Sequence, residues 1–359
     1  MKLDFIEFLA EAAGPRIPHP EDAIFDGGNV AKQYIKALKG VIANPTGVSI
    51  KWDGDIALIF GYDPEGQFFI NDKYMPEGFY AHSAKDWEYY DTQVKKSKSA
   101  RPSLYPKLAA IWEGLKASVT DRAVFKGDLM AVNPNGQPLQ PVKGAYEFTG
   151  PTVHYRIPAN DSNPMGKIVK GKIAIIVVHQ KDGAPWDGKS GLANKSNIAI
   201  FNPSAGVKFK LKDPVQASKA VNAAEALIPA AEQFLAGMDK TSQASIKTYF
   251  NKKITAQTND DLYTWIAANG SPAQQRKLLG DNQDGYLYQN ADGYEALRNV
   301  WNAVYQLKTN LAGQLEQQVA GFEQTVAGQP GGEGFVFNAP TGLVKLVNRG
   351  QFGAAHFNK

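Results

Sequence analysis

Hydrophobic residues recur at two different spacings along this chain, and the change between them limits the folds that it can adopt. Between residues 214 and 327 they recur every three or four positions, as in Ala224, Leu227, Ala231 and Leu235. This spacing predicts amphipathic helices. The rest of the chain mostly has short apolar runs bounded by turn residues, which predict strands. The chain is therefore expected to join a β-rich body to a helical segment.

The two spacings also place the individual elements. Helices are expected at residues 3–13, 29–38, 214–237, 242–251, 259–268, 272–280 and 292–326. Strands are expected at residues 48–52, 56–60, 68–70, 123–132, 152–157, 172–179, 335–337 and 343–347, and a weaker one at 201–211. The turn signal at residues 63–66 predicts a hairpin between the second and third strands. We therefore predict an antiparallel meander, with Lys51 at the inner end of its first strand.

These elements together predict an α+β fold in three consecutive stretches. Residues 1–213 hold the N-terminal helices and the main β-rich body. Residues 214–327 form an inserted all-helical subdomain. The glycine-rich breaker that begins at Gly328 ends the helical spacing, and residues 328–359 return to the body.

Composition excludes several classes of protein. The 359 residues contain no cysteine, which excludes a disulfide scaffold, a thiolate zinc site and a cysteine nucleophile. No apolar run approaches the ~18 residues of a membrane span, and acidic residues at positions 4, 7 and 11 are wrong for a signal peptide. We expect a cytoplasmic protein without a membrane partner. The net charge of +4 is mild, and it permits a polyanionic partner where basic residues cluster.

Two sequence signals for a nucleotide site compete. The first runs from Gly183 to Ser190 and matches the P-loop pattern G-x-x-x-x-G-K-[ST]. In a P-loop, backbone N–H groups at the start of a helix hold phosphates, and the lysine, here Lys189, reaches the outer phosphates. An apolar strand precedes the segment, but the residues after it are a poor helix start. A P-loop kinase or ATPase is therefore an alternative, and a solvated loop between strands is the simpler interpretation.

The second signal is Lys51-Trp52-Asp53-Gly54, a K-x-D-G motif at the end of a predicted strand. Its weight comes from three companions in a fixed order. A strand carries Gly127-Asp128-Leu129, a late strand begins with Glu333-Gly334, and a final hydrophobic strand holds Lys345.

This order resembles motifs I, III, IV and V of the covalent nucleotidyltransferases, the superfamily of ATP-dependent DNA and RNA ligases and mRNA capping enzymes. A further match, F-x-x-x-K from Phe69 to Lys73, resembles the RNA ligases of tailed phages. The stretch from His19 to Gly28 also looks like proteins of tailed phages. The resemblance covers residues 48–211 and 333–350, and it leaves the helical insertion unexplained.

The resemblance implies an antiparallel-sheet nucleotidyltransferase (ligase adenylation) domain that uses ATP and Mg²⁺ or Mn²⁺. Lys51 would be the nucleophile that forms lysyl-AMP. The implied nucleotide contacts are Ile50, Asp53, Gly54, Lys73, Asp128, His179, Glu333 and Lys345, and the implied metal ligands are Glu333 and Asp128. A lysine amine attacks phosphorus only when it is unprotonated, so this chemistry needs a pKa well below the usual ~10.4. Nearby cations and partial burial act in that direction.

The sequence departs from the family pattern at three positions. Ile56 stands where an arginine is common, and Asp128 replaces the usual glutamate of motif III. Motif V usually carries two lysines, whereas Lys345 is alone here and Arg349 is a possible substitute. These departures leave open a nucleotide-binding phage protein, structural or regulatory, with a degenerate ligase fold.

The expected partner is a polynucleotide. The chain ends about a dozen residues after Lys345, without the C-terminal oligonucleotide-binding barrel of DNA ligases, which favours RNA over DNA and an RNA-ligase-like enzyme in the host cytoplasm of a phage. A basic run supplies candidate phosphate contacts at Lys95, Lys96, Lys98 and Arg101. Aromatic residues just before it could stack on unpaired bases, although core packing is the commoner role. The sequence does not indicate an oligomeric state.

Overall fold

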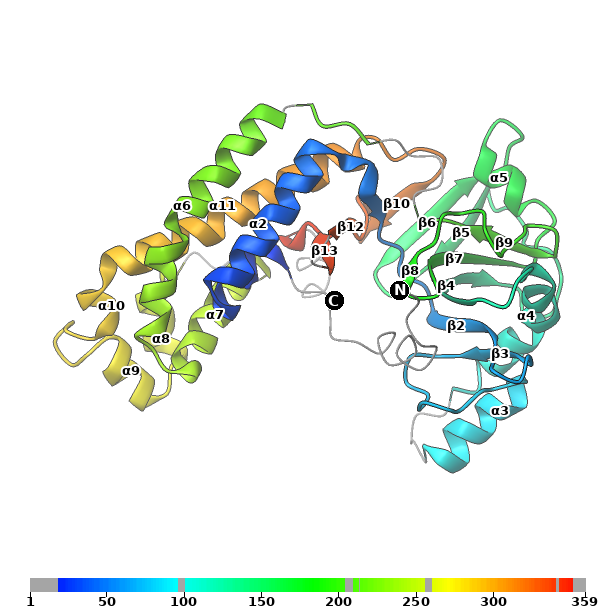
Figure 1. Cartoon of the computed structure of the whole chain (residues 1–359), viewed down its shortest axis with the longest axis horizontal. Helices are drawn as coiled ribbons and strands as arrows, with labels where there is room; N and C mark the ends of the chain where they lie inside the picture. The colour runs from blue at the N-terminus through cyan, green and yellow to red at the C-terminus, as the bar shows by residue number, and fades with distance from the viewer. Residues whose placement is uncertain are drawn as a thin grey trace. The chain divides into compact units, whose positions relative to one another are not determined.

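The computed structural model forms two compact units, each built from separate stretches of the chain (Figure 1). It describes residues 19–95, 101–203, 209–212, 214–255, 260–339 and 342–350. The first unit takes in residues 51–207 and 319–332. The second takes in residues 17–50, 208–318 and 333–359. The helix predicted at residues 3–13 lies outside the described residues.

The first unit contains a mainly antiparallel sheet in which β2 (Ile56–Tyr62) lies between β3 (Phe68–Asn71) and β4 (Val124–Val132), and β4 also pairs with β7 (Ala174–Lys181). Beside β7 lie β8 (Ala184–Pro185), which is antiparallel to it, and β9 (Ile198–Phe201), which is parallel. The predicted hairpin at β2 and β3 is confirmed, and Gly66 adopts a positive φ of 80° in its turn. The predicted strands at 123–132 and 172–179 are confirmed as well. Of the weak strand expected at 201–211, Phe201 belongs to β9, and residues 204–208 lie outside the described residues.

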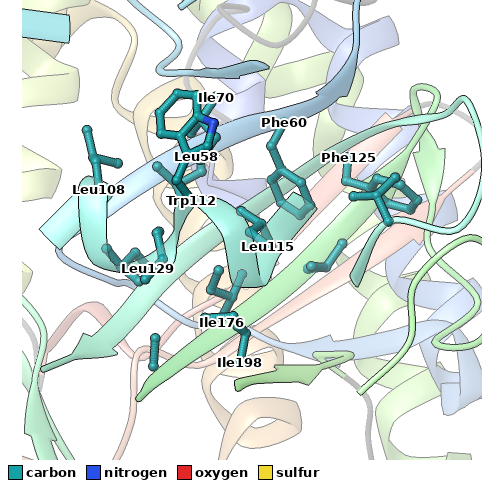
Figure 2. Packing of buried hydrophobic residues seen from close by; sticks show 14 of the residues in the cluster. Leu58, Phe60, Ile70, Leu108, Trp112, Leu115, Phe125, Leu129, Ile176 and Ile198 are labelled. Atoms are coloured by element: carbon teal, nitrogen blue, oxygen red, sulfur yellow. The ribbon is translucent and has the colours of Figure 1, made fainter. Parts of the chain in front are cut away.

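One face of this sheet is apolar and packs against α4 (Tyr105–Ser118) (Figure 2). Side chains that alternate along the strands, among them Phe60, Phe125 and Leu129, meet Leu108 and Leu115 of the helix there. Because successive strand residues point to opposite faces, the residues between them point away from this core. On the opposite face Ile59, Phe69 and Val124 form a smaller apolar cluster, and the polar side chains described below lie on the same face.

A second sheet of the first unit contains β5 (Ala145–Thr149), β6 (Val153–Pro158), β10 (Glu323–Val326) and β11 (Gln329–Pro330), in the order β11-β10-β6-β5. The short helix α5 (Pro164–Val169) follows β6 and is capped by the Asn163 side chain. The helix predicted at 292–326 is wrong over its last part. The observed α11 (Ala291–Glu316) ends earlier, and β10 pairs with β6 along Glu323 to Val326.

The second unit is mostly helical. It contains η1 (Pro20–Asp26), α2 (Gly28–Ala43), η2 (Pro45–Gly47), α6 (Pro214–Ala236), α7 (Lys240–Thr255), α8 (Leu262–Asn269), α9 (Pro272–Leu278), α10 (Tyr286–Gln289) and α11. Its three-stranded sheet has the order β1-β12-β13, with β1 (Val48–Ile50), β12 (Phe335–Ala339) and β13 (Gly342–Leu346). The meander predicted from β1 is therefore wrong, because β1 pairs with β12 and not with β2.

The coarse α+β class is confirmed, since both units combine helices with sheets. The units divide the chain at points other than the predicted 1–213, 214–327 and 328–359. The reason is long-range packing: α2 packs on α6, η1 packs on α11, and β1 pairs with β12. Residues 17–50 and 333–359 therefore belong with the helices, and residues 319–332 belong with β6.

Charged side chains are buried at the centre of the second unit. The Lys308 ammonium lies 2.5 Å from Glu21 Oε1, and both side chains are fully inaccessible to solvent. Arg349 binds Glu21 at 3.1 Å and Asp22 at 3.2 Å. Trp301 Nε1 donates to Asp22 Oδ1 at 3.3 Å. This cluster, which we call the Glu21 cluster, joins η1, α11 and the segment after β13. Arg349, suggested as a substitute for a second motif V lysine, therefore has carboxylates of η1 as partners.

His19 next to this cluster predicts a loss of stability in acid. Burial first, and then the charge of Lys308, lowers the pKa of the His19 imidazole from 6.5 to about 3. Between these values the unfolded chain binds a proton that the folded chain does not, so stability falls as the pH falls through this window. From pH 7 to pH 4.5 the wild-type free energy of unfolding is expected to drop by about 2 kcal/mol more than that of His19→Gln. Urea unfolding at both pH values measures the difference.

The matched control for this prediction is His154→Gln, which removes an exposed histidine of the first unit. Its loss between pH 7 and pH 4.5 should be closer to that of the wild type than to that of His19→Gln, because the His154 side chain is partly exposed. Equal losses in wild type and His19→Gln would show that His19 is protonated in the folded protein as easily as in the unfolded chain.

Candidate functional site

The K-x-D-G segment connects β1 of the second unit to β2 of the first, and aromatic side chains hold it against the second sheet of the first unit. Trp52 is buried, and its ring stacks on Tyr155 of β6 with centroids 5.1 Å apart. The Trp52 ring also packs against Phe322, with the two ring centroids 4.5 Å apart. The backbone N–H of Asp53 donates to the Tyr155 hydroxyl at 3.2 Å. Lys51 and Asp53, on either side of Trp52, are half-buried.

The same segment touches the first sheet through Gly54. A Cβ atom on Gly54 would lie 2.5 Å from the Leu129 carbonyl oxygen and 3.0 Å from Asp128 Cβ, so the position has room only for glycine. The next N–H, that of Asp55, donates to the same Leu129 carbonyl at 2.9 Å. The structure therefore brings together Gly54 and Asp128, which are 74 positions apart (128 − 54) in the sequence.

The polar face of the first sheet carries Asp128 and His179 in direct contact. His179 Nε2 lies 2.7 Å from Asp128 Oδ2, with both side chains largely shielded from solvent. In the β4–β7 register Lys126 faces Gln180 and Gly127 faces Val178, which leaves His179 as the extra residue of a β-bulge. A bulge redirects a side chain and is common beside active sites.

Lys126 lies on the same face, two residues before Asp128. Burial lowers the pKa of the Lys126 ammonium, the Asp128 carboxylate opposes this shift, and the charge of Lys73 adds to it. Lys73, Lys126, Asp128 and His179 thus form one polar group, the β4 polar face. Lys126 was not among the predicted site residues, although its i, i+2 spacing from Asp128 was a usable signal.

The remaining predicted residues belong to the second unit. Ile50 pairs with Phe335 in the β1–β12 register, and Lys345 of β13 pairs with Val336 of β12. Glu333 is buried just before β12. The predicted residues therefore separate into Lys51, Asp53, Gly54, Lys73, Asp128 and His179 in the first unit and Ile50, Glu333 and Lys345 in the second.

Comparison with known proteins assigns a family. A family model described as a family of unknown function, DUF6267, matches residues 16–359. The chain belongs to the DUF6267 family. No curated protein and no solved structure matched it. Within the described part of this DUF6267 chain, none of the helices combines the length and apolar character that a membrane crossing requires.

The P-loop alternative does not fit the local structure of this DUF6267 chain. Residues 170–203 are all described and contain β7, β8 and β9 but no helix after Ser190. The backbone N–H groups of Lys189 and Ser190, which a P-loop would direct at phosphates, donate to Asp187 Oδ1 at 2.9 and 2.8 Å. Trp186 Nε1 closes the turn by donating to the Ser190 carbonyl. The segment is therefore a solvated loop between strands.

The acidic side chains of the described residues do not identify a metal site. Among the residues that the structure describes, no three acidic or histidine side chains come together as metal ligands would. The carboxylate of Asp128 has His179 as its partner. The metal contacts expected at Asp128 and Glu333 stay predictions.

The predicted polynucleotide contacts have different outcomes. Lys95 is exposed, and Lys96 and Lys98 lie outside the described residues. Arg101 is not the free cation that the sequence suggested. Its guanidinium donates to Asp72 at 2.6 Å and to both carboxylate oxygens of Asp91 at 2.8 and 3.0 Å. Arg101 thus ties together two segments of the first unit.

Proposed function

We propose that this DUF6267 protein is an ATP-dependent polynucleotide ligase, with RNA favoured over DNA, that acts through a lysyl-AMP at Lys51 in a domain of the nucleotidyltransferase type. The observation that carries the proposal is the contact of Gly54 with Leu129 and Asp128, which sets the K-x-D-G segment beside the β4 polar face. A motif match alone would not require Lys51 and Asp128 to lie on neighbouring segments.

The proposed reaction begins with the Lys51 amine. Unprotonated Nζ attacks the α-phosphorus of ATP, a P–N bond forms, and the bond to the bridging oxygen breaks as pyrophosphate leaves. Mg²⁺ would neutralise the pyrophosphate oxygens. The α-phosphate gains charge in the transition state, and the ammonium groups of Lys73 and Lys126 are suited to stabilise it.

Two transfers complete the proposed cycle. The oxygen of a 5′-phosphate displaces the Lys51 nitrogen from the AMP phosphorus, which restores the amine and leaves an adenylated strand. A 3′-hydroxyl then attacks the 5′-phosphorus of that strand, the phosphodiester bond forms and AMP leaves. The bonded pair of Asp128 and His179 is a candidate for binding the ribose or moving a proton in these steps. The resemblance implies that Glu333 contacts a metal ion and that Lys345 contacts the α-phosphate. Both residues belong to the second unit.

Covalent labelling tests the proposal. Wild-type protein incubated with Mg²⁺ and α-labelled ATP is expected to keep the label on a denaturing gel, and Lys51→Ala to lose it by at least about 1000-fold, because no other group replaces the nucleophile. The matched control is Lys189→Ala, which removes the exposed lysine of the former P-loop candidate and should label like the wild type. Label on Lys51→Ala, or unlabelled wild type that hydrolyses ATP only when Lys189 is present, would overturn the proposal.

A further inference from the structure

Tyr74 is the most exposed large hydrophobic side chain of the described residues, with 63% of its surface accessible. Two ammonium groups lie over its ring. Lys73 Nζ is 5.0 Å from the ring centroid and Lys95 Nζ is 5.4 Å from it. Of the other aromatic residues that precede the basic run, Trp87 and Tyr90 are buried. The Tyr74 ring is therefore accessible to a ligand at a place where two positive charges are close to it.

The backbone beneath Tyr74 is held firmly. Asp72 Oδ1 accepts hydrogen bonds from the N–H groups of Tyr74 and Met75 at 2.8 and 3.0 Å. The buried Tyr90 donates its hydroxyl hydrogen to the Tyr74 carbonyl at 2.9 Å. Arg101 fixes Asp72 from the other side at 2.6 Å. A ring on so constrained a turn loses little freedom when a planar ligand stacks on it.

The cation at position 95 is brought to the ring by an unusual helix end. The helix α3 (Ala84–Tyr89) continues as the π-helical turn η3 (Tyr90–Val94), which the bond from Lys95 N to the Tyr90 carbonyl at 2.8 Å closes. Such turns occur frequently at functional sites. Lys73 connects the ring with the β4 polar face. It follows β3, whose Asn71 lies in one cross-strand row with Ile59 of β2 and Lys126 of β4, and its charge acts on Lys126.

We infer that Tyr74, Lys73 and Lys95 form a platform for single-stranded polynucleotide, in which an unpaired base stacks on the ring and flanking phosphates meet the two ammonium groups. Every base has a face that can stack on an aromatic ring, and lysines contact the phosphates without selecting a sequence. In a duplex the bases are already stacked, so the platform favours single strands. A membrane would need a wider aliphatic patch than the ring and the exposed Val94 provide.

The inference rests on the proposed function for its choice of partner and deepens it. Lys73 belongs both to the platform and to the β4 polar face, so the platform would hold a strand end beside the residues proposed to carry out AMP transfer. It would recognise an unpaired 5′-phosphorylated end of any sequence.

Oligonucleotide binding by the full chain tests the platform. The probe is a fluorescent 12-nucleotide single strand with a 5′-phosphate, and its anisotropy gives Kd. Tyr74→Leu is expected to raise Kd about 5- to 100-fold, because it removes one base stack, whereas Tyr74→Phe keeps the ring and should stay within twofold of wild type. Tyr288→Leu is the matched control, since Tyr288 is a partly exposed tyrosine that contacts Tyr263 in the second unit. Lys95→Gln is expected to reduce the slope of log Kd against log salt by about 0.7.

Adenylation is measured on the same variants, so that the polynucleotide platform and the ligase activity are tested separately. Tyr74→Leu should still take label from ATP, because that step needs no polynucleotide. Unlabelled wild type with a Tyr74-dependent Kd would support the platform and overturn the ligase. Equal Kd values for wild type and Tyr74→Leu would overturn the platform, and so would tighter Tyr74-dependent binding to phosphatidylserine vesicles than to the oligonucleotide.

Discussion

Replacing Lys308 with methionine is expected to lower the free energy of unfolding by about 3 kcal/mol, measured by urea unfolding. Methionine retains much of the volume and removes the charge, which leaves Glu21 buried without its closest cation. Burial raises the pKa of the Glu21 carboxyl, but the positive charges of Lys308 and Arg349 and the interaction with His19 outweigh it, so the pKa is below its ordinary value. The folded protein therefore needs a cation beside this carboxylate. Arg349, at 3.1 Å, still supplies part of the compensation.

The control for this effect is Lys277→Met. Lys277 also lies 2.5 Å from a carboxylate, that of Asp239, but both side chains of this pair are about half exposed. Exposed ion pairs contribute little, so this variant should lose less than about 1 kcal/mol. The difference between the free energies lost by the two variants measures the effect of burial, because the substitution and the distance from the lysine nitrogen to the carboxylate are the same in both pairs. Similar losses in both would show that the Glu21 cluster is hydrated in the folded protein.

Local patterning predicted most elements of the fold but not their partners. The alternation in residues 123–132 predicts β4 well, since β4 keeps one face in the core and the other outside it. Nothing within residues 48–50 indicates that β1 pairs with a strand more than 280 positions later. Pairing over such separations depends on packing of whole elements, which a local window does not contain. Residues 323–326 show the same effect, because pairing with β6 overrides a helix-like spacing.

Sequence motifs selected some residues of the candidate site but did not predict the contacts that depend on the folded geometry. Lys51, Gly54 and Asp128 were found from their motifs, and the structure places Gly54 against Asp128. The contact between His179 and Asp128 depends on a bulge in β7. The residue pattern of the strand does not indicate where such an extra residue lies. The apolar spacing of residues 292–316 predicts a helix but not the burial of Lys308 among those residues, which is possible because Glu21 of η1 compensates its charge.

Substituting alanine for Gly54 is expected to destabilise the first unit, because the added methyl group meets backbone atoms of β4. The added Cβ would lie 2.5 Å from the Leu129 carbonyl oxygen, which belongs to β4 and cannot rotate away. The K-x-D-G segment must then move off β4, and the Asp55–Leu129 hydrogen bond is lost. We expect a loss of about 2 to 3 kcal/mol in urea unfolding. Gly313→Ala is the control, because Gly313 lies within α11 with open space around it, and this variant should gain up to about 1 kcal/mol.

The same substitution separates the role of the segment in folding from its role in chemistry. If Lys51 is the nucleophile, moving its segment by about 1 Å should reduce ATP labelling roughly 100-fold, even at a temperature where Gly54→Ala is fully folded. Gly150→Ala provides an independent displacement, since its Cβ would lie 2.1 Å from the Asp53 carbonyl oxygen and press on the segment from the side of the second sheet. Both variants should lose labelling while Gly313→Ala keeps it. Folded Gly54→Ala and Gly150→Ala that label as fast as the wild type would mean that the position of Lys51 does not limit the reaction, and the contact that carries the proposed function would lose its significance.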